Sequence, residues 1–407
     1  MRVLFIHQNF PAQFVHLAPA LAADVKNDVR VLTPSQRPIP KGVKAHYYTI
    51  KRSSSENIHP WLVDMETKTI RGEAAFWAAL ELKKQGFTPD IIIAHPGWGE
   101  SLFLKEVWPN AKLALYCEFY YQAKGADTNF DPEFSKDETD LACRLKLKNA
   151  TFDLQLAQAD AGISPTHFQR SVFPEQFQSK ISVIHDGIDT NLIKPNPQVT
   201  MQLNGKTLTR DDQIITFVNR NLEPMRGYHI FMRALPEILK QNPNARVVIV
   251  GGDDVSYGSR PPAGTTWKEL LLNEVKSQLD MSRVHFVGKL SYPNFIQLLQ
   301  LSTVHVYLTY PFVLSWSLLE AMSAGCAIVA SDTAPVREVI KQNETGVLVD
   351  FFNIDAITEY VSYLLKNSKA KVLLGEMARE IVLQYYNHEK ICLPRQKLWV
   401  REVLDRS

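Results

Sequence analysis

Two arginines stand six residues apart around a predicted turn from a strand to a helix. Arg220 follows the apolar run at 213–219, and Arg226 comes directly before Gly227, after which residues 228–240 have helical character. The first N–H groups of a helix have no partner inside the helix, so such a turn is suited to an anion. Guanidinium groups beside it can bind phosphate oxygens in pairs. We therefore predict a phosphate site here, with plain surface charge as the alternative.

A strand–loop–helix–strand unit covers residues 304–331. Two apolar runs, typical of buried parallel strands, flank a predicted helix at 317–324, which Gly325 ends. In open α/β sheets, ligands bind where loops leave the carboxyl ends of the strands. The helix N-terminus near Ser315 is therefore suited to a phosphate, and Glu320, one turn further on, to a pair of sugar hydroxyls. The alternative is a βαβ unit that binds nothing.

The N-terminal half contains a third group of polar and aromatic residues. Residues 95–100 are His-Pro-Gly-Trp-Gly-Glu and follow a predicted strand, and Glu118 follows the next predicted strand at 111–115. The glycines allow a tight backbone, and Trp98 can stack on a sugar face. The alternative is that His95 is a structural histidine and Trp98 packs in the core.

The composition describes a globular chain of 407 residues, enough for two or three domains. A net charge of +2 gives no argument for a nucleic-acid partner. The four cysteines are scattered without a CxxC pair, which favours free thiols, a reducing compartment and no zinc site. The N-terminal apolar run is short enough to be a first strand rather than a signal peptide, and no stretch approaches the length of a membrane span. We expect a cytoplasmic protein.

Several motifs together resemble a known family. Leu-Leu-Glu-Ala-Met at 318–322, Val-Ala-Ser-Asp at 329–332 and Glu338 look like the donor-nucleotide signature of retaining family-4 glycosyltransferases of GT-B fold, and residues 181–189 are similar to that family's hinge. The resemblance implies an α/β protein with two Rossmann-like domains facing one another across a central cleft. The implied domains are 1–190 on the acceptor side, 191–385 on the donor side, and a C-terminal helix at 386–407 that packs back on the first domain.

The resemblance also implies roles for single residues. Arg220 and Arg226 match two cations that hold the donor diphosphate, and Glu320 matches the residue that holds the ribose. His95 and Glu118 complete the expected catalytic set. The residues expected around the nucleotide are Gly251, Lys289, Leu290, Ser315, Trp316, Leu318 and Leu319.

Three positions depart from the family pattern. Phe312 stands where the family usually has a glutamate for the donor sugar, Glu118 stands where many members have a histidine, and Asn219 replaces a glycine. The donor-sugar contact must then be made differently, for example by backbone and Ser315. The departures at Phe312 and Glu118 keep open the alternative of a non-catalytic protein that binds a nucleotide sugar or a glycan.

The implied reaction is transfer of a sugar from a UDP or GDP sugar to an acceptor hydroxyl, with retention at the anomeric carbon. We expect no other cofactor and no metal. The expected partners are the nucleotide sugar and a glycan, lipid-linked or small-molecule acceptor, with peripheral membrane contact in the lipid-linked case. Polysaccharide or glycoconjugate synthesis is the expected role, and a nucleotide-sugar 2-epimerase of the same fold is a further alternative.

Overall fold

The computed structural model describes residues 1–135 and 139–406, and the chain divides into two units. The first unit comprises residues 1–128, 136–187 and 388–407, and the second comprises 129–135 and 188–387. The sequence predicts that residues 129–135 belong to the first domain, because the residues before and after them in the chain do. The structure groups this segment with the second unit, through contacts between side chains far apart in the sequence.

The first unit is built on a parallel sheet with the strand order β3-β2-β1-β4-β5-β6-β7. Apolar side chains fill the central strands, as expected for a sheet that is covered on both faces. The strands are β1 (Arg2–Ile6), β2 (Asp28–Thr33), β3 (Lys44–Tyr47), β4 (Ile91–Ala94), β5 (Lys112–Tyr116), β6 (Ala161–Ser164) and β7 (Ile181–Val183). The helices are α1 (Leu17–Ala22), α2 (Val63–Lys84), α3 (Leu104–Val107), α4 (Leu141–Gln158), α5 (His167–Ser171), α6 (Glu175–Gln178) and α14 (Leu393–Asp405).

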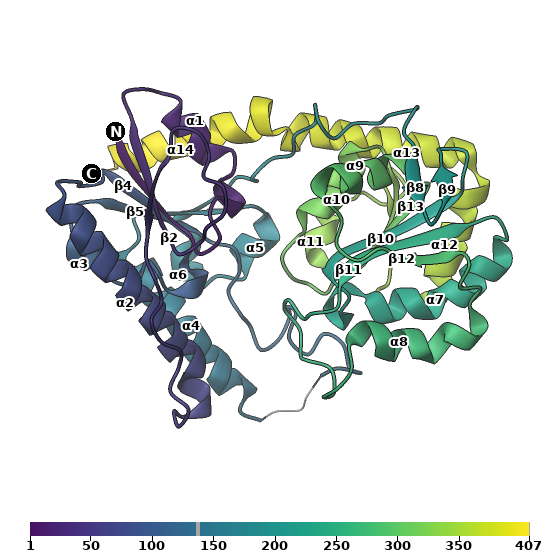
Figure 1. The fold of residues 1–407 in the computed structure, drawn as a ribbon, viewed down its shortest axis with the longest axis horizontal. Helices are drawn as coiled ribbons and strands as arrows, with labels where there is room; N and C mark the ends of the chain where they lie inside the picture. The colour runs from purple at the N-terminus through teal and green to yellow at the C-terminus, as the bar shows by residue number, and fades with distance from the viewer. Residues whose placement is uncertain (136–138, 407) are drawn as a thin grey trace. The chain divides into compact units, whose positions relative to one another are not determined.

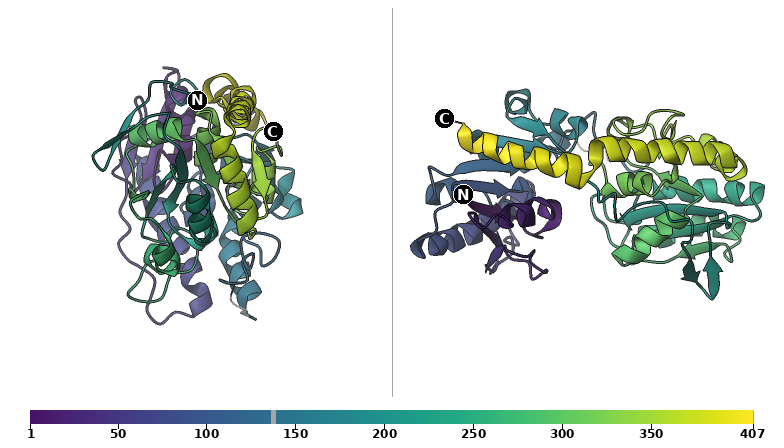
Figure 2. Two further views of the ribbon diagram at one scale, coloured as in Figure 1. Left: turned by 90° about the vertical axis from the view of Figure 1, so that its right-hand side faces the viewer. Right: turned by 90° about the horizontal axis from the view of Figure 1, so that it is seen from above.

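The C-terminal helix α14 belongs to the first unit (yellow in Figures 1 and 2). Its buried side chains Trp399, Val400 and Val403 join the apolar core formed by β1, β2 and α1. Gly187 lies against this end of the chain with φ +93°, and a Cβ there would come within 2.5 Å of the His388 Cα. Only glycine therefore fits at position 187, where the backbone lies directly against His388.

The second unit contains a parallel sheet with the order β12-β11-β10-β13-β14-β15 and a separate antiparallel pair, β8–β9. The strands are β8 (Met201–Leu203), β9 (Lys206–Leu208), β10 (Ile214–Asn221), β11 (Arg246–Gly252), β12 (Val284–Phe286), β13 (Val304–Tyr307), β14 (Ala327–Ser331) and β15 (Val347–Val349). The helices are α7 (Tyr228–Gln241), α8 (Trp267–Val275), α9 (Tyr292–Leu301), α10 (Trp316–Ser323), α11 (Ala334–Arg337), α12 (Ile354–Lys366) and α13 (Ser368–Ile381).

Each sheet has one place where the strand order reverses. In the first unit it lies between β1 and β4, and in the second between β10 and β13. The loops that leave such neighbouring strands diverge to opposite faces of the sheet, and ligands of this fold class bind there. Among the described residues, no helix is both long enough and apolar enough to span a bilayer.

Candidate functional site

Arg226 lies at the point of strand reversal in the second unit, in the turn between β10 and α7. Gly227 follows it with φ +70°, and a Cβ at that position would meet the Leu308 Cβ at 2.2 Å. The glycine thus lets α7 begin close beneath the end of β13. Arg226 is 7% exposed, and its Nη1 donates to the Thr309 hydroxyl at 2.8 Å and to the Val313 carbonyl at 3.1 Å. Both acceptors come from the loop between β13 and α10.

The two predicted arginines meet at Tyr257. The Arg220 Nη1 donates to the Tyr257 hydroxyl at 3.3 Å, and the Arg226 guanidinium lies 5.5 Å from the centre of the Tyr257 ring. The buried Phe312 ring lies 5.5 Å from Arg226 and 5.1 Å from Tyr257. The position at which the family pattern has a glutamate therefore holds an aromatic wall that packs on the guanidinium.

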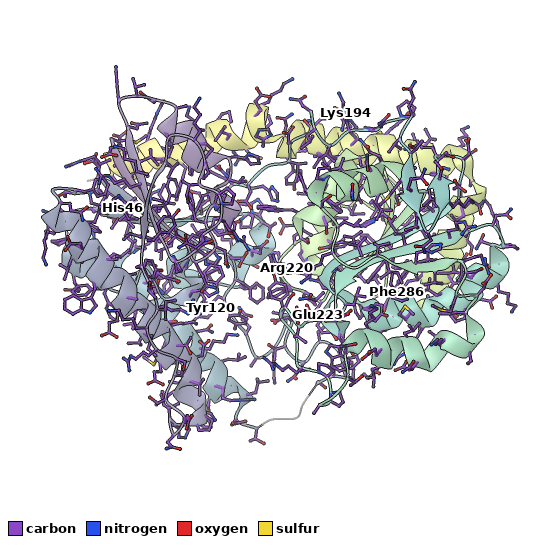
Figure 3. The ribbon with its side chains drawn as sticks, in the orientation of Figure 1. His46, Tyr120, Lys194, Arg220, Glu223 and Phe286 are labelled. Atoms are coloured by element: carbon purple, nitrogen blue, oxygen red, sulfur yellow. The ribbon has the colours of Figure 1, made fainter. Side chains whose placement is uncertain are left out.

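Glu223 is a residue of this site that the sequence analysis missed. It is 1% exposed, and its carboxylate accepts hydrogen bonds from the backbone N–H groups of Ser256, Tyr257 and Gly258, at 3.1–3.3 Å. These bonds hold the loop that carries Tyr257 beside β10, where Figure 3 labels both Arg220 and Glu223. The partners are 33 to 35 residues away in the chain, so no local motif announces them.

Helix α10 begins next to this arginine pair. Ser315 caps it by accepting the Ser317 N–H, and the Ser315 N–H donates to the Tyr307 hydroxyl at 3.0 Å. Leu318 and Leu319 are fully buried and fix the helix against the sheet. Trp316, the first residue of the helix, is half-buried.

Glu320 lies on the second turn of α10 and is 7% exposed. The Tyr292 hydroxyl, from the start of α9, donates to its Oε1 at 2.7 Å. Burial raises the pKa of Glu320 to about 7, although the bond from Tyr292 opposes that shift. The carboxyl group is therefore held in one orientation and is close to its titration point at neutral pH.

The three remaining predicted nucleotide positions lie at the carboxyl ends of β11 and β12. Gly251 is buried, and a Cβ there would approach Leu222 to 2.7 Å, so the strand needs a glycine. Lys289 is exposed with its Nζ 3.8 Å from Asp254, and Leu290 packs at the edge of the core beside β10 and α9. All three thus lie, like Arg220, at the carboxyl ends of the strands of the second sheet.

The first unit gathers a different polar cluster at its own strand reversal. His7 follows β1 and His95 follows β4. The His95 Nδ1 accepts the Gly97 N–H at 3.1 Å, which leaves its proton on Nε2. Likewise the His7 Nδ1 accepts the Asn9 N–H at 2.8 Å, and burial together with the nearby His95 lowers the pKa of His7 to about 3. Both rings are held in defined tautomers.

Glu118 receives two hydrogen bonds in this cluster. The Gln13 Nε2 donates to one oxygen at 2.9 Å, and the His95 Nε2 donates to the other at 3.2 Å. Burial alone would raise the pKa of Glu118, but these bonds outweigh it, so the pKa lies below its ordinary value. Trp98 packs on His95, with ring centres 4.4 Å apart, and on His7 at 4.9 Å. The structure thus brings His95 and Glu118 together, and the Glu118 carboxylate in this pair is ionised.

Comparison with known proteins agrees with this architecture. A family model described as glycosyl transferase family 4 group matches residues 25–193, and one described as glycosyl transferases group 1 matches residues 202–381. A D-inositol 3-phosphate glycosyltransferase of Mycobacterium avium is 26% identical over 46% of this chain and 41% of its own length. A GDP-mannose-dependent mannosyltransferase of Mycolicibacterium smegmatis, acting on phosphatidylinositol monomannoside, is 23% identical over 55% of this chain and 58% of its own. The chain thus spans about half the length of these curated relatives.

Solved structures resemble the chain over nearly its full length. Sucrose-phosphate synthase from Thermosynechococcus elongatus superposes with a TM-score of 0.76 at 19% identity, covering 99% of both chains. The Anabaena protein HepE, solved in complex with UDP and glucose, gives 0.65 at 15% identity and covers 98% of this chain and 100% of its own. At these identities the likeness establishes the fold. With glycosyltransferase models matched along both units, the chain belongs to the family-4 glycosyltransferases and has the GT-B fold.

Proposed function

We propose that the protein transfers a sugar from a nucleoside-diphosphate sugar to an acceptor hydroxyl, with retention at the anomeric carbon. The observation that carries the proposal is the meeting of Arg220 and Arg226 at Tyr257, at the strand reversal of the second sheet and beside the N-terminus of α10. Two guanidinium groups are donors suited to a diphosphate, and the positive end of the α10 dipole also favours an anion. Glu320, one turn into the same helix, is suited to accept from both ribose hydroxyls.

The proposed chemistry follows from where charge develops. As the bond between the anomeric carbon and the diphosphate oxygen breaks, negative charge grows on the diphosphate and positive charge on the sugar ring. Arg220, Arg226 and the positive end of the α10 helix dipole stabilise that negative charge without reorganising. The acceptor oxygen bonds to the anomeric carbon on the face that the diphosphate leaves, and the acceptor proton passes to a phosphate oxygen. No protein base is then required, and no metal.

We assign an orienting role to the cluster in the first unit. Glu118 is ionised and fixed by His95 and Gln13, so it can accept a hydrogen bond from a sugar hydroxyl. His95 is the donor in its bond to Glu118, and therefore acts by holding that carboxylate. Both residues are expected to affect the use of donor or acceptor more than the departure of the diphosphate.

The ligand classes remain part of the proposal. UDP and GDP are the candidate nucleotides, supported by the Anabaena structure solved with UDP and by the GDP-mannose dependence stated for the mycobacterial relative. The acceptor is a glycan, a lipid-linked glycan or a small molecule, within polysaccharide or glycoconjugate synthesis. The proposed location is the cytoplasm, with peripheral contact to the inner face of the membrane where the acceptor is lipid-linked.

The experiment is a panel of UDP and GDP sugars scored by thermal shift and then by turnover. A ligand that binds only the folded protein raises the midpoint in proportion to its affinity and concentration. The stabilising donor is then incubated with candidate acceptors, and the anomeric configuration of the product is determined by NMR. An inverted product refutes the retaining chemistry. Donor binding without turnover supports a binding protein, and epimerisation without an acceptor supports an isomerase.

A further inference from the structure

Residues 129–135 pack on the second unit although they lie in the chain between β5 and α4 of the first. Phe130 sits among three aromatic rings, with centres 5.0 Å away at Tyr310, 5.4 Å at Phe351 and 5.3 Å at Phe352. Phe134 contacts Trp267 edge-on at 5.2 Å. We call residues 129–135 the clasp segment. Its two phenylalanines anchor it at either end of a short turn.

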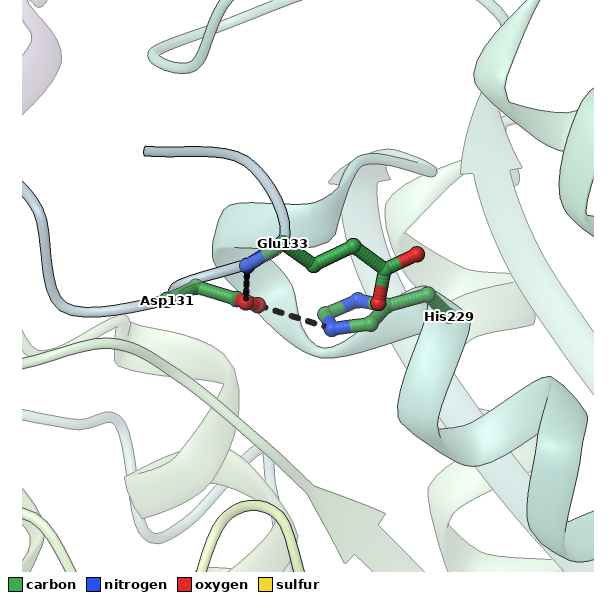
Figure 4. Close-up of side chains that lie close together, drawn as sticks. All are labelled: Asp131, Glu133 and His229. Carbon is green, nitrogen blue, oxygen red and sulfur yellow. Dashed lines mark hydrogen bonds and ion pairs between the residues drawn. The ribbon is translucent and has the colours of Figure 1, made fainter. Parts of the chain in front are cut away.

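Asp131 is the polar centre of the clasp segment and is 3% exposed. The Tyr310 hydroxyl donates to its Oδ2 at 2.7 Å. The fully buried His229 places Nε2 2.9 Å from the same oxygen, as Figure 4 shows. Its other oxygen accepts the Glu133 N–H at 3.0 Å. Burial would raise the pKa of Asp131, but these bonds lower it below its ordinary value. The group is therefore an ionised carboxylate that accepts charge-assisted hydrogen bonds.

The side chains of Asp131, Glu133 and His229 lie close enough together to suggest a metal site. The bonding argues against a metal. Arg233 binds both oxygens of Glu133, at 2.6 and 2.7 Å, and both oxygens of Asp131 already accept hydrogen bonds. A cation would have to displace the guanidinium group, which carries the same sign of charge. The cluster is better described as a hydrogen-bonded network in which Arg233 and Glu133 form an ion pair.

Tyr310 connects Asp131 to the arginine site. It lies directly after Thr309, whose hydroxyl accepts from Arg226, and its own N–H donates to the Met225 carbonyl at 3.0 Å. The loop between β13 and α10 is therefore held on one side by Asp131 and on the other by Met225 and Arg226. If the bond from Tyr310 is lost, the loop is freed on the side that fixes the two acceptors of the guanidinium group.

We propose that Asp131 is a positioning residue for the donor site, acting through Tyr310 to hold Arg226 in its phosphate-binding orientation. The expected effect of Asp131 on ligand binding rests on the proposed function. Its expected effect on the orientation of Arg226 rests on the loop geometry alone. It assigns a role in the donor site to a segment that the chain order places between elements of the first unit.

The test uses Tyr310→Phe and Asp131→Asn, with Glu133→Gln as the matched control. Tyr310→Phe keeps the ring packing and removes only the hydroxyl, and Glu133→Gln weakens the clasp segment at its Arg233 contact, away from the loop. Crystal structures of the full-length variants without ligand should show the Arg226 Nη1 displaced from Thr309 and Val313 in the first two variants and in place in the control. Calorimetry with UDP, GDP, uridine and guanosine then measures affinity.

We expect Tyr310→Phe and Asp131→Asn to weaken the nucleoside diphosphate about tenfold, as for one lost charge-assisted bond. The nucleoside without phosphates should bind as in the wild type, which a general loosening of the fold would not allow. Combining Tyr310→Phe with Arg226→Lys should give less than the sum of the single effects. An unmoved Arg226 overturns the inference, as does a stoichiometric metal ion on Asp131. If the wild type binds neither UDP nor GDP, the proposed function fails, while the crystal structures still decide the role of Asp131.

Discussion

Glu320 offers the sharpest test of the donor site, because its burial has a measurable cost. The pKa of this carboxyl group rises from 4.5 to about 7 on folding. Since the folded protein holds the proton more tightly, the ionised group opposes folding. The penalty is absent below about pH 4.5, grows as the pH rises toward 7 and is constant above it. At about 1.4 kcal/mol for each pKa unit, its full size is about 3 kcal/mol.

Glu320→Gln removes the ionisation and keeps an oxygen that can accept from Tyr292. The variant should gain about 2 kcal/mol of stability at pH 8, after about 1 kcal/mol is subtracted for the weaker bond to Tyr292. At pH 5 this advantage disappears, because the wild-type carboxyl group is then largely protonated. The difference between the two proteins should change by about 2.5 kcal/mol between pH 5 and pH 8 in urea unfolding.

The same substitution should weaken the binding of the nucleoside diphosphate about tenfold at pH 8, the effect of one lost charge-assisted bond. In the wild type the affinity should rise between pH 6 and pH 8, as the ionised fraction of Glu320 grows from roughly a tenth to nine-tenths. Tyr292→Phe is the control, since it removes the donor and leaves the carboxyl group. A variant that binds as the wild type, or a stability difference that does not change with pH, refutes this account of Glu320.

Three further outcomes are expected. Arg220→Ala and Arg226→Ala should each lower kcat about a hundred- to a thousandfold by removing charge beside the departing diphosphate, and near-wild-type turnover in either would contradict the assignment. EDTA should leave turnover unchanged; activity lost to EDTA and restored by manganese would refute the metal-free chemistry. Glu118→Gln should lower the free energy of unfolding above about pH 4.5, because the pKa of this group is lowered on folding. In urea unfolding at lower pH, the stability difference between variant and wild type should become smaller. A difference that stays constant with pH would refute the ionised carboxylate.

The strand-to-helix turns could be predicted from the sequence because their signals are local. The apolar run predicted at 213–219 corresponds to β10, and the helix predicted at 228–240 corresponds to α7. Gly227 and Gly325 occupy positions with positive φ, where glycine is required or strongly favoured. Periodicity and glycine placement depend on residues close together in the chain, so they can be recognised without knowledge of the tertiary structure.

The contacts that shape the site could not be predicted in this way. Glu223 binds the loop at 256–258, Tyr292 binds Glu320 from 28 residues away, and Asp131 meets Tyr310 across 179 residues. Each pair joins two loops or helix ends whose approach depends on the sheet order. A single sequence does not encode that order in any short pattern, so the pairs appear only in the folded chain.

The departure at position 312 acquires a physical meaning from the surroundings of Arg226. Arg226 is 7% exposed, and the contacts of its guanidinium group include a hydroxyl, a carbonyl and the rings of Tyr257 and Phe312. None of these partners carries negative charge, so they orient the cation without neutralising it. A carboxylate at position 312 would compete with the diphosphate for the same guanidinium group. An aromatic side chain there leaves the charge of Arg226 for the ligand and excludes water, which strengthens the attraction.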